Sequence, residues 1–155
     1  TGKISLGLAN IYKGRLDKIM IGNLEAKRDW GFAKEYVEGM WSMLQQPQAD
    51  DYVLATGKTY TVRYFIEMTA RCLGIDLVWS GNGVNEVGID GKTGKTIIEV
   101  NKQFYRPAEV DVLIGDASKA KNKLGWSATT TLDKLAEMMV YSDIKRIECG
   151  KYETV

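Results

Sequence analysis

Two arginine motifs contain the side chains of this sequence that are best suited to hold a ligand. The first, Arg-Asp-Trp-Gly, occupies residues 28–31, and the second, Arg-Pro-Ala-Glu-Val-Asp, occupies residues 106–111. A guanidinium group is planar, keeps its charge, and binds phosphate oxygens through two parallel hydrogen bonds. If the fold brings Arg28 and Arg106 into one cleft, they form a clamp for a diphosphate. The ligand that the sequence favours is therefore a diphosphate that links a nucleoside to a sugar.

Each motif also has a simpler interpretation. Asp29 reads as a helix N-cap, which needs no functional explanation, and Arg28 beside it could be an ordinary surface charge. Pro107 keeps Arg106 out of the helical region and fixes the direction of the chain there. Glu109 is a natural acceptor for ribose hydroxyls, but with Arg106 it could equally form a surface ion pair of little energetic value.

Composition limits the chemistry that the chain can perform. The sequence has 155 residues, is 45% hydrophobic, and carries a net charge of +1, which favours neither nucleic acid nor an anionic membrane as a partner. Histidine is absent, so imidazole bases, Ser-His-Asp triads and imidazole zinc sites are excluded. Two cysteines cannot complete a tetrahedral zinc site, and no apolar run reaches the roughly 20 residues that span a bilayer. We expect no metal site and a cytoplasmic protein.

Hydrophobic periodicity predicts one mixed α/β piece without repeats or linkers. The apolar stripe behind Asp29, which runs to Leu44, predicts an amphipathic helix that Pro47 stops. Residues 51–55 read as a buried strand. The sequence further predicts helices from residue 4 to Gly14, from Thr61 to Gly74, over 117–124, and from Thr131 onward. It predicts strands at 18–21, 75–80, 87–90 and 96–100, and the last two of these form a hairpin.

Three further motifs resemble known sites but are better explained by structure. Residues 90–96, Asp-Gly-Lys-Thr-Gly-Lys-Thr, echo a P-loop, yet a strand-like run follows where a helix is needed, so a hairpin turn is the better interpretation. Residues 81–86 begin like a dinucleotide fingerprint, but Glu86 replaces the third glycine. Tyr141 and Lys145 have the spacing of a short-chain dehydrogenase pair, but they fall beside the apolar stripe of the last helix, which argues against catalysis.

Read together, several segments resemble one family closely. Residues 22–37, Gly-Asn-Leu-Glu-Ala-Lys-Arg-Asp-Trp-Gly-Phe-Ala-Lys-Glu-Tyr-Val, are similar to the corresponding stretch of the GDP-mannose 4,6-dehydratases. So are Tyr-Arg-Pro-Ala-Glu-Val-Asp at 105–111, Gly-Asp-Ala-Ser-Lys-Ala-Lys at 115–121 and Leu-Gly-Trp at 124–126. The resemblance runs in order from Thr1 to about Asp143. Two positions depart from it: Gly2 stands where an arginine is usual, and Phe32 where histidine is frequent.

This resemblance implies a fold, a reaction and a set of contacts. The family belongs to the extended short-chain dehydrogenase/reductases, with an N-terminal Rossmann domain for NADP and a smaller C-terminal part for the GDP-sugar. The reaction converts GDP-mannose into GDP-4-keto-6-deoxymannose and water. A hydride passes from C4 of the sugar to NADP and returns at C6. By match of motif, Arg28 and Arg106 hold the diphosphate, Glu109 the ribose, and Lys3 borders the guanine.

The glycine turn for NADP and the family's catalytic residues have no matching positions here, and the first residue is Thr rather than Met. We therefore expect residues 1–155 to be a single substrate-binding portion of a longer, homo-oligomeric enzyme. Within that enzyme, we expect residues 51–73 to form the last strand and helix of the Rossmann layer. Residues 1–155 alone are expected to be inactive. Three alternatives stay open: another nucleotide-sugar reductase or epimerase of the same family, a non-catalytic module that binds a GDP-sugar, and a scaffold whose arginines make only surface pairs.

Overall fold

The structure, a computed structural model, describes residues 1–105 and 114–150, and the chain divides into two units. Unit 1 comprises Thr1–Ala26, Thr61–Glu109 and Ala136–Val155. Unit 2 comprises Lys27–Tyr60 and Val110–Leu135.

A four-stranded sheet forms the frame of unit 1, in the order β1-β6-β5-β4. The strands are β1 (Ile19–Ile21), β4 (Leu77–Ser80), β5 (Val87–Asp90) and β6 (Thr96–Val100). β4, β5 and β6 pair antiparallel, and the predicted hairpin between β5 and β6 is confirmed. β1 joins β6 in parallel, with Ile19 opposite Ile98 and Ile21 opposite Val100. The carboxyl ends of β1 and β6 therefore lie at one edge of the sheet.

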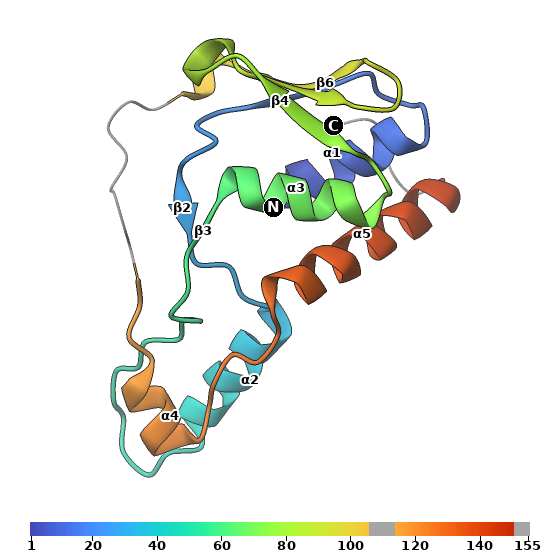
Figure 1. The fold of residues 1–155 in the computed structure, drawn as a ribbon. Coiled ribbons are helices and arrows are strands. Elements are labelled where there is room, and N and C mark those ends of the chain that lie inside the picture. The colour runs from blue at the N-terminus through green and yellow to red at the C-terminus, as the bar shows by residue number, and fades with distance from the viewer. Residues whose placement is uncertain (106–113, 151–155) are drawn as a thin grey trace. The chain divides into compact units, whose positions relative to one another are not determined.

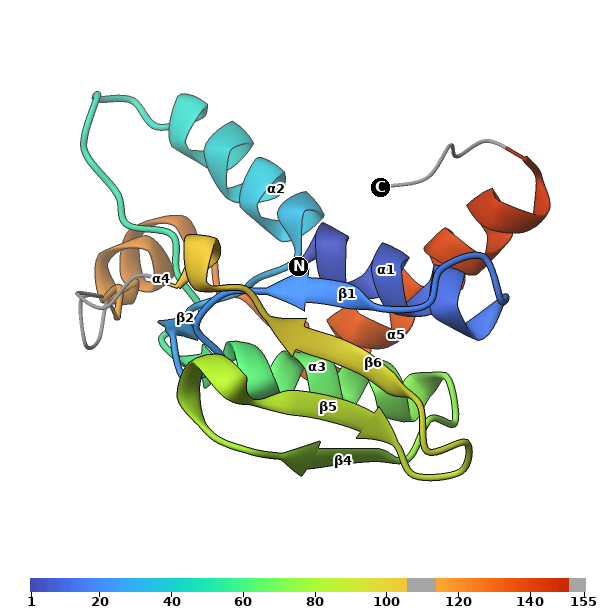
Figure 2. The same ribbon diagram turned by 90° about the horizontal axis from the view of Figure 1, so that it is seen from above.

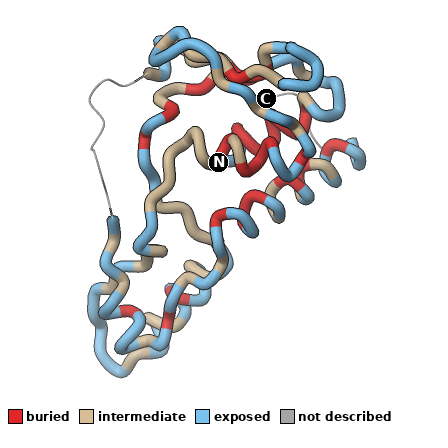
Figure 3. The backbone as a smooth tube through the Cα atoms, in the orientation of Figure 1, coloured by how far each residue is buried: buried red, intermediate tan, exposed pale blue. Residues whose placement is uncertain are grey.

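Helices α1 (Gly2–Tyr12) and α3 (Val62–Cys72) cover one face of this sheet, as Figures 1 and 2 show. Thr61 caps α3 as expected, because its hydroxyl oxygen accepts a hydrogen bond of 3.1 Å from the Tyr64 amide. Helix α5 (Leu132–Glu148) packs on α1 in its later part, where Ile147 meets Leu6 and Ala9. Figure 3 shows many of the buried residues in these layers. The largest completely buried apolar side chains are Phe65, Leu8, Ile66, Ile98 and Ile147.

Unit 2 is organised around Trp126. The unit contains β2 (Lys27–Arg28), α2 (Ala33–Leu44) and α4 (Ser118–Leu124), and β2 pairs with β3 (Tyr60–Thr61). Gly125 ends α4 in the left-handed conformation, with φ of 65°, and the chain then turns Trp126 back over the helix, as the sequence predicts. The indole ring of Trp126 meets Tyr36 edge-on at 5.5 Å, and its N–H donates a hydrogen bond of 2.7 Å to the carbonyl of Glu35.

The prediction that Asp29 caps α2 is wrong. The helix begins after Phe32, whose side chain makes no capping hydrogen bond. The carboxylate of Asp29 instead accepts hydrogen bonds from the backbone N–H groups of Thr56 and Gly57, both at 3.0 Å, and from the Thr56 hydroxyl at 2.6 Å. Because these donors lie 27 and 28 residues further along the chain, a local sequence pattern could not reveal them.

The prediction of a buried strand at residues 51–55 is also wrong, since no strand among the described residues pairs with this segment. The helical stripe on α2 exists, but most of it is exposed, and Leu44 keeps 82% of its surface accessible. The residues of the stripe that are exposed are Val37, Met40, Trp41 and Leu44. A narrower face packs instead, where Gly39 lies against Leu54 and Trp126. Periodicity predicted the helix correctly, but not which face would be covered.

Candidate functional site

The segments that lead to the two arginine motifs begin side by side in unit 1. After β6, the amide of Asn101 donates a hydrogen bond of 2.8 Å to the carbonyl of Ile21, the last residue of β1. The next residue, Gly22, lies against the backbone carbonyl of Phe104 so closely that an added Cβ would collide with it. Residues 22–27 then run toward Arg28, and residues 101–105 run toward Arg106. The parallel pairing of β1 with β6 thus starts both segments at one edge of the sheet.

Lys3 lies at this same edge. It belongs to the first turn of α1, and its Nζ atom lies 4.7 Å from the centroid of the Phe104 ring. A cation over an aromatic face is attracted by the ring quadrupole. The first turn of a helix also carries partial positive charge on its unpaired N–H groups. The edge therefore combines a helix start, a lysine and an aromatic ring that precedes Arg106 by two residues.

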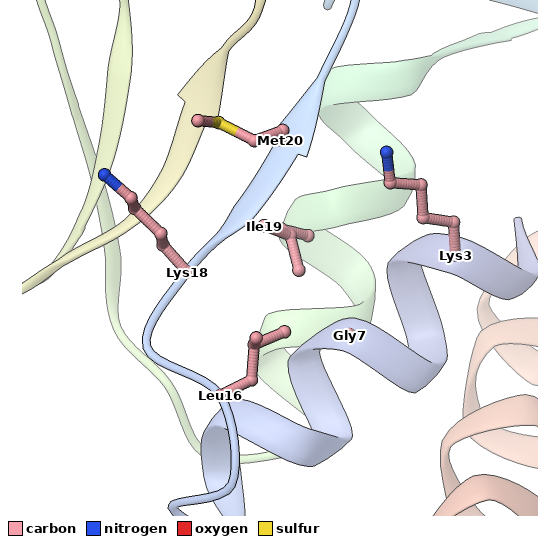
Figure 4. A pocket seen from close by; sticks show the side chains of 6 residues that line it. All are labelled: Lys3, Gly7, Leu16, Lys18, Ile19 and Met20. Carbon is pink, nitrogen blue, oxygen red and sulfur yellow. The ribbon is translucent and has the colours of Figure 1, made fainter. Parts of the chain in front are cut away.

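A pocket of about 240 Å³ adjoins Lys3, between α1 and β1 (Figure 4). Helix and strand approach closely here, because Gly7 lies directly against the side chain of Ile19. Lys18 is engaged by Glu99, 2.7 Å from its Nζ atom. The pocket therefore has mainly apolar walls, with the ammonium group of Lys3 at the α1 end. Its lining residues are Lys3, Gly7, Leu16, Lys18, Ile19 and Met20.

Arg63 holds the segment that runs toward Arg28. Its amide donates a hydrogen bond of 2.9 Å to the carbonyl of Leu24, and its guanidinium binds Glu25 at 2.6 and 2.7 Å. The same guanidinium binds both carboxylate oxygens of Glu86, at 2.7 and 2.9 Å, and lies 4.7 Å from the ring of Trp79. The hydrogen bonds to Glu86 first, and those to Glu25 next, outweigh burial and raise the pKa of Arg63 above its ordinary value. Local patterns gave no signal for this cluster, because its members come from four separate segments.

The residues predicted to contact the ligand are only partly within the described ranges. Lys3 belongs to unit 1, and Arg28 to unit 2, where it is exposed in β2 and donates a hydrogen bond of 2.7 Å to the carbonyl of Lys27. Arg106 and Glu109 lie outside the described residues. The convergence of Arg28 and Arg106 on one diphosphate stays a prediction.

Two hydrogen-bond clusters order unit 2 around the Arg28 motif. Asp29, next to Arg28, holds the turn at residues 56–57, as described above. Glu35 Oε1 accepts four hydrogen bonds, of 2.6 to 3.1 Å, from the amides and hydroxyls of Thr129 and Thr130. Burial by itself raises the pKa of the Glu35 carboxyl, but these hydrogen bonds outweigh it, so the pKa lies below its ordinary value. The segment before α5 is thereby attached to the start of α2.

The motifs that the sequence argued against have the structures expected of them. Residues 91–95 form the turn between β5 and β6, and residues 81–86 lead through a short 3-10 helix (Gly83–Asn85) into β5 rather than into an α-helix. Tyr141 is 61% exposed, and Lys145 stacks over its ring at 4.4 Å.

Within residues 1–105 and 114–150, no helix combines the length and apolar character that crossing a membrane requires.

Solved structures with a similar fold show the fold class of the chain. RMD from Pseudomonas aeruginosa, solved in complex with NADPH, superposes with a TM-score of 0.73 over 94% of this chain and 42% of its own, at 15% identity. The dTDP-glucose 4,6-dehydratase of Bacillus anthracis, solved in complex with NAD, has a TM-score of 0.68 over 94% of this chain and 40% of its own, at 18% identity. The fold is that of part of a Rossmann-type extended short-chain dehydrogenase/reductase, as predicted.

Sequence comparison identifies the family within this class. The family model described as GDP-mannose 4,6 dehydratase matches residues 1–139. The human GDP-mannose 4,6 dehydratase is 48% identical over 145 residues, which cover 94% of this chain and 39% of the human protein. The chain belongs to the GDP-mannose 4,6-dehydratase family, and it spans well under half the length of this relative.

Proposed function

We propose that these residues form the GDP-sugar-binding part of an enzyme that converts GDP-mannose into GDP-4-keto-6-deoxymannose and water. The observation that carries the proposal is the edge of the sheet in unit 1. There the parallel ends of β1 and β6 start the segments toward Arg28 and Arg106 side by side, with Lys3 next to the second of them. Family membership supports this choice of substrate and of reaction.

Each ligand group has a residue that suits it chemically. Arg28 and Arg106 bind the diphosphate through charge-assisted, bidentate hydrogen bonds. Glu109 accepts hydrogen bonds from the ribose hydroxyls, and Lys3 lies beside the guanine, with the apolar pocket between α1 and β1 adjoining it. Binding energy from these groups, which do not react, holds the sugar in place for chemistry elsewhere in the protein.

The cofactor of this reaction is NADP, which supplies a hydride acceptor when bound. The described residues do not fit it, because the glycine-rich segment at 81–86 continues into a strand and so lacks the helix N-terminus that a dinucleotide diphosphate needs. We assign NADP and the catalytic groups to another part of the enzyme. From the resemblance we retain the assignment of residues 51–73 to the end of a Rossmann layer, in which α3 supplies the helix and residues 51–55 pair with no described strand. From composition we further propose that the enzyme is cytoplasmic, and by analogy with the family that it is a homo-oligomer, either a dimer or a tetramer.

The reaction is tested on the protein expressed from its own gene. We expect incubation with GDP-mannose and NADP to yield a product lighter by one water, with a 4-keto group that can be trapped by borohydride. If the protein leaves GDP-mannose unchanged but uses NADPH to reduce added GDP-4-keto-6-deoxymannose, it is a reductase instead. An unchanged mass with inverted stereochemistry indicates an epimerase. Tight binding of GDP-mannose without turnover indicates a binding module.

The clamp is tested by replacing its arginines singly. We expect Arg28→Ala and Arg106→Ala each to raise the apparent Michaelis constant for GDP-mannose about tenfold or more. This is the loss of affinity that follows removal of a charged hydrogen-bond donor. The difference from the unaltered protein shrinks at high salt if charge is the cause. Arg71→Ala, an exposed arginine on α3, is the matched control and leaves the constant unchanged. If both Arg28→Ala and Arg106→Ala leave the Michaelis constant for GDP-mannose unchanged, the hypothesis of a diphosphate clamp is wrong.

A further inference from the structure

We propose that Arg63 is a positioning residue for the diphosphate site, which it serves by fixing the segment 22–27 that leads to Arg28. The inference rests on the proposed function, because it assumes that Arg28 binds the diphosphate. It concerns a residue with no predicted contact to the ligand.

The segment is held from two sides. On one side, Gly22 abuts the Phe104 carbonyl, and Asn101 is hydrogen-bonded to Ile21. On the other side, the guanidinium of Arg63 binds the carboxylate of Glu25. Residues Leu24 and Ala26, which flank Glu25, are buried with 3% and 7% of their surface exposed. The contacts therefore hold the chain as far as Ala26, two residues before Arg28.

The geometry of Arg63 is specific to a guanidinium group. Its Nη1 and Nη2 atoms bind the two oxygens of Glu86, while Nε and Nη2 bind Glu25. The plane of the group also lies over Trp79, at 4.7 Å from the ring. Glu86 is only 12% exposed in its side chain, and it is fixed in turn by the hydrogen bond from the Val100 amide to its carbonyl. An ammonium group has the same charge, but it cannot bridge two carboxylates in a plane and stack at the same time.

This arrangement separates two parts of the ligand. Lys3 and its pocket are built on α1 and β1, and none of their lining residues belongs to the Arg63 cluster. Loosening the segment 22–27 therefore acts on the chain next to Arg28 and on none of the residues that line this pocket. The loss of affinity falls on ligands that carry a diphosphate and not on the nucleoside, a pattern that general destabilisation does not produce.

The test compares the binding affinities of GDP and of guanosine, measured by calorimetry and by competition, on the protein expressed from its own gene. For both Arg63→Lys and Glu25→Gln, we expect GDP to bind more weakly by up to about tenfold, which is the loss of one charge-assisted hydrogen bond between Arg28 and the diphosphate, and guanosine to bind as before. Arg71→Lys, on the same helix and exposed, is the matched control and changes neither ligand. Glu25 has a side chain that is 64% exposed, so its replacement tests the idea even if Arg63→Lys folds poorly.

Two results overturn the inference. One is an unchanged affinity for GDP in Glu25→Gln, and the other is an equal loss for GDP and guanosine in both variants. Arg28→Ala measured alongside identifies which idea has failed. A normal affinity for GDP in Arg28→Ala means that the proposed diphosphate site is wrong. A weak affinity there, together with normal binding in Glu25→Gln, means that only the role of Arg63 is wrong.

Discussion

Replacing Gly22 with alanine tests the junction at which both arginine segments begin. The added Cβ would collide with the carbonyl oxygen of Phe104 and would lie 3.1 Å from its carbonyl carbon and 3.3 Å from its Cβ. These atoms belong to or adjoin the backbone, so no flexible side chain can move aside. Overpacking of this kind typically costs about 1–3 kcal/mol. We expect Gly22→Ala to lose that much unfolding free energy, and to bind GDP more weakly because the segment toward Arg106 is displaced.

Urea-induced unfolding measures the first effect, and calorimetric titration with GDP measures the second. Gly2→Ala is the control, because nothing lies within 4 Å of the position where its Cβ would be. Its unfolding free energy should stay within about 0.5 kcal/mol of the unaltered protein. If Gly22→Ala matches this control in both measurements, the tight contact between the ends of β1 and β6 does not organise the site, and the reasoning is refuted.

Two further predictions concern unit 2. Asp29→Ala leaves the amides of the turn at 56–57 without their hydrogen-bond acceptor. We expect the unfolding free energy, measured by urea titration, to fall by about 1–3 kcal/mol. A loss below about 0.5 kcal/mol, which is typical of a surface substitution, contradicts this role of Asp29. The lowered pKa of Glu35 means that its carboxylate stabilises the folded protein above the ordinary value of 4.5, and that this contribution is lost as the pH falls below it. The difference in unfolding free energy between the unaltered protein and Glu35→Gln should therefore be largest near neutral pH and narrow on acidification; a difference that is constant from pH 7 to about pH 3 contradicts this expectation.

Local rules predicted most elements of the fold and failed where partners are distant in the sequence. Thr61 and Gly125 act as cap and terminator, because both roles depend on residues within four positions. Asp29 has the composition of a cap, but its carboxylate reaches the turn at 56–57, which offers three donors. Residues 51–55 have the composition of a strand, but a strand needs a neighbour to receive its hydrogen bonds.

The residues of the candidate site also fall into those that the sequence could reveal and those that it could not. Lys3 and Arg28 could be selected from the sequence, since a family motif is a string of residue types at fixed spacing. Gly22 and Arg63 could not be selected, because their importance comes from Phe104, Glu86 and other residues far along the chain.

By itself the sequence determined the family, the order of helices and hairpin, and the kind of ligand that its arginines favour, because these depend on composition and on local spacing. Only the tertiary structure decided that β1 runs parallel to β6, that the segments toward both arginine motifs begin at one edge, and that Arg63 joins Glu25 to Glu86. The physical reason is that strand pairing and ion pairs of this kind join residues many positions apart. Their energies depend on which surfaces meet when the chain folds, and not on the neighbours of each residue in the sequence.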